Sequence, residues 1–234
     1  MILYANGDSH TAAAEAVNSY AFAEDDRNLV HLGRLPHPAN LAVSWGKKLS
    51  TLLKMAFYCG AESAASNDRI IRTTKEYINN YTQDVTNLFV VIGWSTWERE
   101  EWLIDDVYYQ INASGTDIVP NSHKEKYKEY ITNVNWRHKT NQAHKDIIEL
   151  HKWLDDKSIT HVFFNGNNTF SQIQNKFDFG TSYIEPYNKK FSYNDYLIDN
   201  GISTVSHNSY HFGEDGHTKW TNYMLKYIGK NKLI

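Results

Sequence analysis

The sequence contains little cysteine, proline or glycine: its 234 residues include 1 Cys, 4 Pro and 12 Gly. With Cys59 as the one thiol, no disulfide can form within the chain, which fits a reducing compartment. A chain of this length buries about 70–75% of its unfolded surface on folding, so a hydrophobic core is sufficient for stability. No Pro-rich or Gly-rich stretch marks a linker, and we therefore expect one domain over residues 1–234.

The sequence also lacks a long hydrophobic run and a strong excess of one charge. Its longest apolar stretch, LFVVIGW at 88–94, is far shorter than the roughly 20 residues of a membrane-spanning helix. The formal net charge of −3 argues against nucleic-acid binding through bulk positive charge. The first residues show no signal peptide. We therefore expect synthesis in the cytoplasm and neither a membrane nor a nucleic acid as partner.

Hydrophobic spacing alternates between short strands and amphipathic helices. Apolar runs predict buried strands at 2–5, 88–92 and 159–164, and helical spacing predicts helices at 41–57, 67–81, 141–155 and 214–228. This alternation is typical of an α/β domain with a mainly parallel sheet. Residues 99–136 have no clean periodicity and are predicted to form an insertion, either a lid or a partner surface.

Residues with reactive side chains follow the predicted strands, at the edge where parallel sheets bind ligands. The stretch LYANGDSHTAAAEAV reads as strand, turn and helix, with Ser9 at the turn. A serine there serves as a helix cap, a phosphate contact or a nucleophile. His211 precedes the last predicted helix, from which an imidazole could reach the first strand and take the proton of the serine.

Four blocks of the sequence resemble the SGNH hydrolases, the GDSL-type lipases and esterases. They are GDSH (7–10), ESAASNDRII (62–71), VVIGWSTWERE (90–100) and NSYH (208–211). The resemblance implies a flavodoxin-like three-layer α/β/α sandwich with a mainly parallel five-stranded sheet. It also implies a serine esterase without a cofactor. The strings SNDRIIRTT and VIGWSTWERE resemble a subtype often carried by tailed phages of marine bacteria, which would make the protein virion-associated.

The resemblance also implies a role for each matching residue. Ser9 would be the nucleophile and His211 the base, while the amides of Ser9 and Ala64 and the hydroxyl of Ser95 would hold the oxyanion. The chain departs from the family at three positions. Ala64 stands where glycine is usual, Ser95 where the family has asparagine, and Asn208 where it has the aspartate that orients the histidine.

The group that orients the histidine is open at this point. Asn208 can accept a hydrogen bond but supplies no charge, and a backbone carbonyl could take its place. Four carboxylates in this part of the chain are further candidates: Asp195, Asp199, Glu214 and Asp215. A second alignment interprets Glu214 and His217 as the acid and the base.

Three histidines near the end of the chain are candidates for a metal site. His207 and His211 have the i, i+4 spacing of helical zinc ligands, with His217 nearby, but position 208 lacks the glutamate of the zinc-protease pattern. We therefore predict no metal.

Trp94 and Asn165 are expected to contact the substrate, an O-acyl group on a glycan. The alternative is a catalytically weakened SGNH-fold binding or virion protein.

Overall fold

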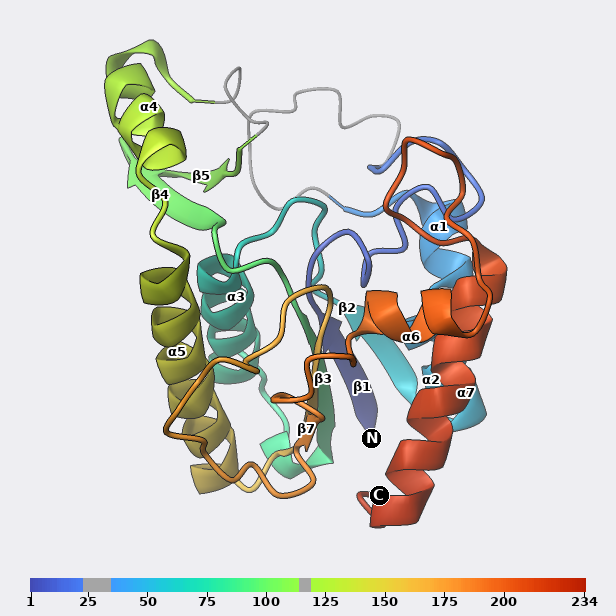
Figure 1. Ribbon diagram of the computed structural model, residues 1–234. Helices are drawn as coiled ribbons and strands as arrows, with labels where there is room; N and C mark the ends of the chain where they lie inside the picture. Colours follow the sequence, from blue (N-terminus) through green and yellow to red (C-terminus); the bar gives the residue numbers. More distant parts are fainter. Residues whose placement is uncertain (23–34, 114–118) are drawn as a thin grey trace.

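The computed structural model describes residues 1–22, 35–113 and 119–234 (Figure 1). In chain order the elements are β1 (Ile2–Asn6), α1 (Pro38–Val43), α2 (Trp45–Leu52), β2 (Ala56–Cys59), α3 (Asn67–Asn79), η1 (Val85–Asn87), β3 (Leu88–Trp94), β4 (Glu100–Ile104), β5 (Val107–Ile111), η2 (Asn121–His123), α4 (Lys124–Thr132), α5 (Trp136–Asp156), β6 (Thr160–Asn165), β7 (Tyr183–Ile184), α6 (Tyr193–Asp199) and α7 (Glu214–Asn231). None of the helices in these ranges is long and apolar enough to span a bilayer.

The main sheet has five parallel strands in the order β2-β1-β3-β6-β7. Leu3 of β1 pairs with Phe57 of β2 on one side and with Phe89 of β3 on the other. The chain therefore adds β2 on one side of β1 and then crosses over to add β3 on the other side. In parallel sheets this reversal opens a crevice beyond the carboxyl ends of the two central strands. The predicted three-layer α/β/α fold with a mainly parallel sheet is confirmed.

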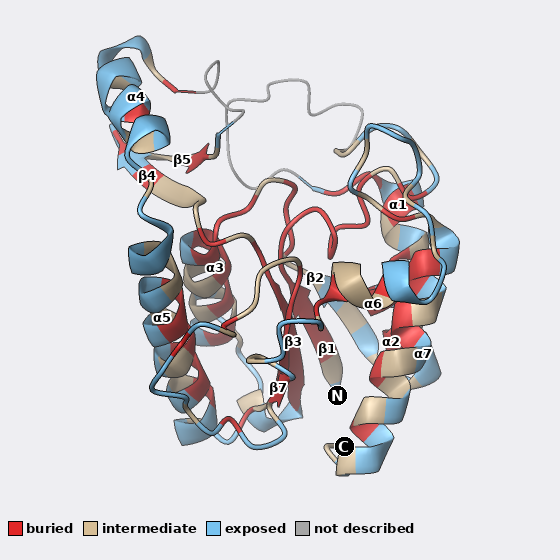
Figure 2. Cartoon of the chain, in the orientation of Figure 1, coloured by how far each residue is buried: buried red, intermediate tan, exposed pale blue. Residues whose placement is uncertain are grey.

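Alternating side chains build one core on each face of the sheet. Val90 and Ile92 of β3 belong to the core under α3 and α5, whereas Phe89 and Val91 belong to the core under α2, α6 and α7. All four side chains are fully buried, which explains the continuous apolar run of this strand. Figure 2 shows the same pattern, with buried residues on the strands and exposed residues on the outer faces of the helices.

The predicted helix at 41–57 is wrong. Ser44 ends α1 and caps α2, with its hydroxyl accepting a hydrogen bond from the amide of Lys47 at 3.1 Å. Lys54 then has a left-handed φ of 55°, and Ala56–Cys59 pair with β1 as an edge strand. The apolar residues at the end of the run fit helical spacing, but pairing with β1 decides their conformation. The other three helices are confirmed as α3, α5 and α7.

Within the predicted insertion at 99–136, β4 and β5 form an antiparallel hairpin followed by α4. Residues 114–118 of this segment lie outside the described residues. The hairpin is fastened to α3, because Arg72 binds Glu101 through two hydrogen bonds of 2.7 Å and Gln110 accepts a hydrogen bond from the amide of Ser66. The segment thus braces the amino-terminal end of α3.

Candidate active site

Ser9 lies in the loop that follows β1, at the crevice of the sheet. Asn6, the last residue of β1, anchors the loop: its carboxamide oxygen accepts from the amide of Gly7 at 2.8 Å. Gly7 packs so closely that a Cβ there would lie 2.7 Å from the carbonyl oxygen of Gly93 and 2.3 Å from Oγ1 of Thr11. The loop is therefore pressed onto the end of β3.

The helix predicted directly after Ser9 does not form. Residues 8–19 are turns and bends, and Ala13 and Glu15 have left-handed φ angles of 56° and 62°. Such angles are costly for non-glycine residues and interrupt a right-handed helix. Ser9 is therefore not the cap of a regular helix.

The hydroxyl of Ser9 has no hydrogen-bond partner among the described residues, and the residue is 7% exposed. Its amide is also unpaired within the described ranges, as is the amide of Ala64. Two backbone donors and one hydroxyl are thus available in this part of the crevice. This is the composition that acyl transfer requires of a nucleophile and its oxyanion hole.

Glu15, rather than Asn208, contacts the histidine. Nδ1 of His211 lies 2.8 Å from Oε2 of Glu15, and the hydroxyl of Ser209 donates to the same oxygen at 2.5 Å. These hydrogen bonds, from Ser209 first and then His211, lower the pKa of the Glu15 carboxyl. Asn208 is exposed and has no side-chain hydrogen bond to the described residues. The carboxylate in contact with His211 therefore comes from the loop that carries Ser9.

His211 lies beside the residue that follows Ser9. The rings of His211 and His10 meet edge to face, with centroids 5.5 Å apart. No hydrogen bond joins the hydroxyl of Ser9 to His211. Because Nδ1 is occupied by Glu15, Nε2 is the ring nitrogen left for proton transfer, and no described residue binds it.

Two of the other proposed acids and the second base are engaged elsewhere. Glu214 pairs with Lys48 at 2.7 Å, and Asp195 accepts a hydrogen bond from Ser192 at 2.7 Å. His217 is buried, and its Nδ1 accepts from the amide of Trp45 at 3.3 Å. Burial lowers the pKa of His217 to about 3. His217 is therefore a neutral packing residue, and the alignment that makes it the base is wrong.

The described residues contain one group of three side chains that could hold a metal ion, and none of His207, His211 and His217 belongs to it. It consists of His151, Asp155 and His161. His151 lies on α5 and His161 at the amino end of β6, whereas Ser9 follows the carboxyl end of β1. The group thus lies at the opposite edge of the sheet. Its two rings already bind each other, with 2.8 Å between Nδ1 of His151 and Nε2 of His161.

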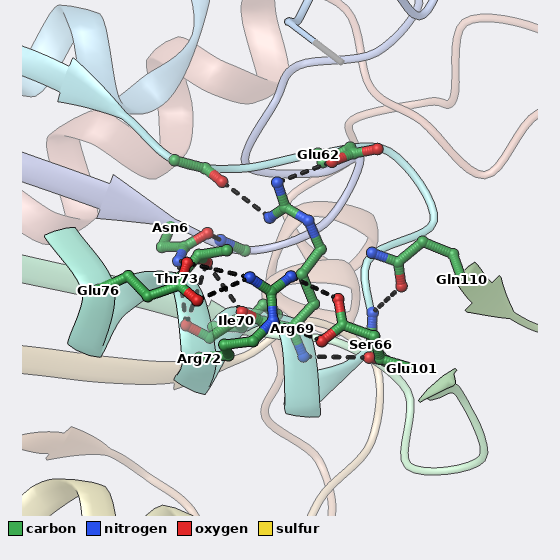
Figure 3. A network of polar contacts seen from close by, with 12 residues as sticks. Asn6, Glu62, Ser66, Arg69, Ile70, Arg72, Thr73, Glu76, Glu101 and Gln110 are labelled. Carbon is green, nitrogen blue, oxygen red and sulfur yellow. Dashed lines mark hydrogen bonds and ion pairs between the residues drawn. The ribbon is translucent and has the colours of Figure 1, made fainter. Parts of the chain in front are cut away.

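The loop that carries Ala64 is held rigidly on both sides (Figure 3). The guanidinium of Arg69 donates to the carbonyl of Gly60 at 3.0 Å and forms a buried ion pair with Glu62 at 2.7 Å. The amide of Glu62 in turn donates to the carbonyl of Gly7 at 3.2 Å, which ties this loop to the Ser9 loop. Ala64 itself has a left-handed φ of 69°, a conformation that glycine adopts at no cost.

Ser95 does not offer a free donor. Its hydroxyl donates to Oδ2 of Asp8 at 3.0 Å and accepts from Nη1 of Arg99 at 2.9 Å. A hydroxyl has one proton, so this proton is not available to an oxyanion while the bond to Asp8 persists. Asp8 is buried, and its carboxylate is also 3.2 Å from Nη1 of Arg99.

Trp94 and Asn165 do not line the crevice. Trp94 is fully buried and packs edge to face on Phe163. Asn165 is also buried; its oxygen accepts from the hydroxyl of Tyr183 at 2.6 Å and its nitrogen donates to the carbonyl of Pro186 at 3.4 Å. Trp94 is the last residue of β3 and Asn165 the last residue of β6, and both lie on the face of the sheet that α3 and α5 cover. They are structural residues rather than substrate contacts.

A polar groove begins next to the Ser9 loop instead. It has a volume of about 880 Å³ and lies between the start of α5 and the segment after β6. Asn167, in its wall, donates a hydrogen bond of 3.3 Å to Nε2 of His10. Burial lowers the pKa of His10 to about 4, so the ring is neutral and can accept this bond. Two tryptophans also line the groove: Trp97, which is buried, and Trp136, which is 51% exposed.

The fold and the site define a three-layer α/β protein with a serine and a carboxylate–histidine pair at the crevice of its sheet. Residues 36–175, more than half of the chain, match the model of a family of unknown function, DUF6071. The chain belongs to this family. No curated protein matches its sequence.

Two solved structures of esterases resemble the fold at low sequence identity. The psychrotrophic esterase EstA from Pseudoalteromonas sp., determined with monoethylphosphonate as inhibitor, has 11% identity and a TM-score of 0.50, with 98% of this chain and 97% of EstA covered. The acetyl xylan esterase Est2A from Butyrivibrio proteoclasticus has 13% identity and a TM-score of 0.48, with 100% of this chain and 65% of Est2A covered. The likeness to EstA establishes the fold; neither structure supports the phage subtype.

The sequence did not identify Glu15 or Arg99 as site residues, whereas for Asn167 it left open a contact with substrate hydroxyls or a turn. Glu15 had one signal, a carboxylate six positions after the serine in the same loop, but its contact with His211 spans 196 positions. Arg99 lies near the end of the third motif block and is the first residue of the predicted insertion, where a charged side chain reads as part of that insertion. Asn167 was one of several asparagines after β6, and turn formation explains such residues equally well.

Proposed function

We propose that the protein is a serine esterase with Ser9 as nucleophile, His211 as general base and Glu15 as the carboxylate that orients the base. The observation that carries this proposal is the 2.8 Å contact between Glu15 and Nδ1 of His211. The ring of His211 also packs on the ring of His10, the residue that follows Ser9. An ionised carboxylate on Nδ1 keeps the proton on that nitrogen and leaves Nε2 unprotonated. It also stabilises the imidazolium that forms when the serine loses its proton.

The reaction proceeds in two halves. The oxygen of Ser9 attacks the ester carbonyl, its proton passes to Nε2 of His211, and the carbonyl electron pair moves to the oxygen. When the tetrahedral intermediate collapses, the bond to the alcohol breaks and Nε2 returns the proton to the alcohol. Water then attacks the acyl-serine, with His211 again taking and returning a proton, and this step releases a carboxylic acid and free Ser9. A rotation of the Ser9 or His211 side chain that closes their hydrogen bond precedes the attack, since catalytic hydrogen bonds often tighten only with substrate present.

The amides of Ser9 and Ala64 are the backbone donors for the oxyanion. Both are unpaired within the described ranges, and both loops are fixed in place through Gly7 and Glu62. Donors that are held in position before the reaction stabilise the developing charge without reorganisation. The left-handed φ of Ala64 is consistent with a backbone strained in order to direct its amide.

The substrate that we propose is an O-acyl group on a glycan. The groove beside His10 is lined mainly by polar side chains that can hydrogen-bond to hydroxyl groups; these include Thr140, Asn141, Asn167, Asn168, Gln172 and Asn175. Trp136 presents an exposed aromatic face in the same groove, on which a sugar ring can stack. A lipid ester would need a larger apolar lining than this one.

The fold likeness to EstA supports the choice of an esterase, and the residues of this chain supply the mechanism. The test is hydrolysis of p-nitrophenyl acetate and of acetylated xylo-oligosaccharides by the wild type, Ser9→Ala and His211→Ala. We expect turnover in the wild type and a loss of at least 10³-fold, an order-of-magnitude figure, in both variants at unchanged melting temperature. Absence of turnover in the wild type, with binding of the oligosaccharide retained, would favour the alternative of a binding or virion protein.

A further inference from the structure

Arg99 is anchored at the centre of the crevice through one of its terminal nitrogens. Nη1 lies 2.9 Å from the hydroxyl oxygen of Ser95, 3.2 Å from Oδ2 of Asp8 and 3.4 Å from the carbonyl oxygen of Ala65. Asp8 and Ala65 are the immediate chain neighbours of Ser9 and Ala64. The guanidinium therefore bridges the two loops whose amides are unpaired.

The rest of the guanidinium is unused. Nε and Nη2 make no hydrogen bond to any residue in the described ranges, so three of the five N–H donors have no protein partner. The Arg99 side chain is 21% exposed, whereas that of its partner Asp8 is 3% exposed. Solvent thus reaches an arginine whose charge is balanced by a buried aspartate and whose position is fixed by three acceptors.

Ser95 explains why such a donor is needed. The hydroxyl at this position gives its proton to Asp8 and has none left for a substrate. The donors placed so far for the oxyanion are the backbone amides of Ser9 and Ala64.

We propose that Arg99 is the third oxyanion donor of this centre and takes over the task that the SGNH resemblance assigns to position 95. This inference rests on the proposed esterase function. An N–H of a cation forms a hydrogen bond to a developing oxyanion that is roughly twice as strong as one from a neutral amide. The ion pair with Asp8 holds the guanidinium in place before the substrate arrives, so little reorganisation accompanies charge development.

The test compares Arg99→Met, Arg99→Lys and Arg72→Met on two substrates, neutral p-nitrophenyl acetate and an ester of the same phenol whose acyl group carries a carboxylate. Arg72 is a matched control, because its side chain is 23% exposed and its partners are Glu76 and Glu101, outside the crevice. We expect Arg99→Met to lower kcat by about 10²–10³-fold on both substrates, the usual loss for one oxyanion donor. Arg99→Lys, which keeps the charge, should recover part of this loss, and Arg72→Met should equal the wild type.

Two results would overturn the inference. One is a kcat for Arg99→Met within about threefold of the wild type. The other is a rise in KM confined to the carboxylate-bearing ester, which would make Arg99 a contact for a substrate anion.

Because Arg99→Met leaves Asp8 unpaired, the double variant Asp8→Asn/Arg99→Met is measured as well. If it is folded and equally slow, the inference stands, and if it is folded and fast, it fails. A wild type without Ser9-dependent turnover would refute both the esterase function and this role of Arg99. A wild type that turns over, with Arg99→Met equally fast, would refute the role of Arg99 alone.

Discussion

Nδ1 of His211 and Oε2 of Glu15 are 2.8 Å apart, although 196 positions separate the two residues in the chain. The loop after β1 therefore carries both the serine and the carboxylate, while the loop before α7 supplies the imidazole. Glu15 reaches His211 from a left-handed backbone conformation, and Ser209 binds the same carboxylate oxygen at 2.5 Å. A strained residue that is held by two hydrogen bonds is typical of a functional site.

The first prediction concerns the orienting carboxylate. Glu15→Gln should lower kcat by about 10³-fold on p-nitrophenyl acetate, because a neutral amide cannot stabilise the imidazolium. The loss is set somewhat below the roughly 10⁴-fold effect of the same change in a serine protease, since Glu15 is partly exposed. Asn208→Ala and Asn208→Asp are the controls, and both should retain wild-type rates because position 208 is exposed. A fast Glu15→Gln enzyme with a slow Asn208→Ala enzyme would return the role to Asn208.

The second prediction concerns stability in acid. Burial lowers the pKa of His217 to about 3, whereas an unfolded histidine titrates near 6.5. Below pH 6.5 the unfolded chain binds a proton at this residue that the folded chain rejects, so stability falls as the pH is lowered towards 3. From pH 7 to pH 5 this residue should cost on the order of 2 kcal/mol of unfolding free energy.

Urea unfolding of the wild type, His217→Gln and His138→Gln at pH 7 and pH 5 measures this contribution. The glutamine at 217 retains an oxygen that can accept from the amide of Trp45, and it should remove the share of about 2 kcal/mol that His217 contributes, leaving the similar shares of His10 and His161 in place. His138 is exposed, and its replacement should leave the loss unchanged. Equal pH dependence in all three proteins would show that His217 titrates normally in the fold.

The third prediction concerns the left-handed residue of the oxyanion loop. Ala64→Gly should raise the melting temperature or leave it unchanged, because glycine adopts a φ of 69° without the cost of about 1–2 kcal/mol that a Cβ imposes. Activity should stay within about threefold of the wild type, since the amide donor is retained. A valine at the same position, whose branched side chain is poorly tolerated at positive φ, should lower both quantities. A stabilising valine would indicate that residue 64 does not hold this conformation in solution.

The fourth prediction concerns the groove. Trp136→Ala should raise KM for acetylated oligosaccharides by about two- to tenfold, corresponding to the roughly 0.5–1.5 kcal/mol of an aromatic contact, and leave p-nitrophenyl acetate unaffected. Trp136 is 51% exposed at the start of α5, so the melting temperature should change little. Tyr210, which is 82% exposed and does not line the groove, provides the control variant Tyr210→Ala. An equal loss on both substrates would argue against a glycan site here.

The sequence predicted the central strands well because their burial on two faces leaves a continuous apolar signal, as in β3. It failed for β2, where helical spacing continues into residues that pair with β1, and for β7, which has only two residues. Strand ends were harder to assign than strand centres. Trp94 was expected in the crevice, yet it lies on the same face of the sheet as Ile92 and continues that core.

The motif blocks predicted Ser9 and His211 as residues for one crevice, because both predictions follow from local patterns around a strand end and a helix start. The partners of these residues depend on tertiary contacts that have no local pattern. Glu15 reaches His211 only because the loop after β1 leaves the helical conformation. Arg99 reaches Asp8 only because β3 lies beside β1 in the sheet. Electrostatic partners of this kind can be identified only from the three-dimensional structure.

The most direct measurement of the central claim, that the Glu15–His211 pair activates Ser9, is covalent labelling with a fluorophosphonate followed by intact-mass analysis and peptide mapping. We predict one adduct per chain, on Ser9, formed rapidly by the wild type, slowly by Glu15→Gln and not at all by Ser9→Ala. Absence of labelling in the folded wild type, or a label on another residue that persists in Ser9→Ala, would contradict the account.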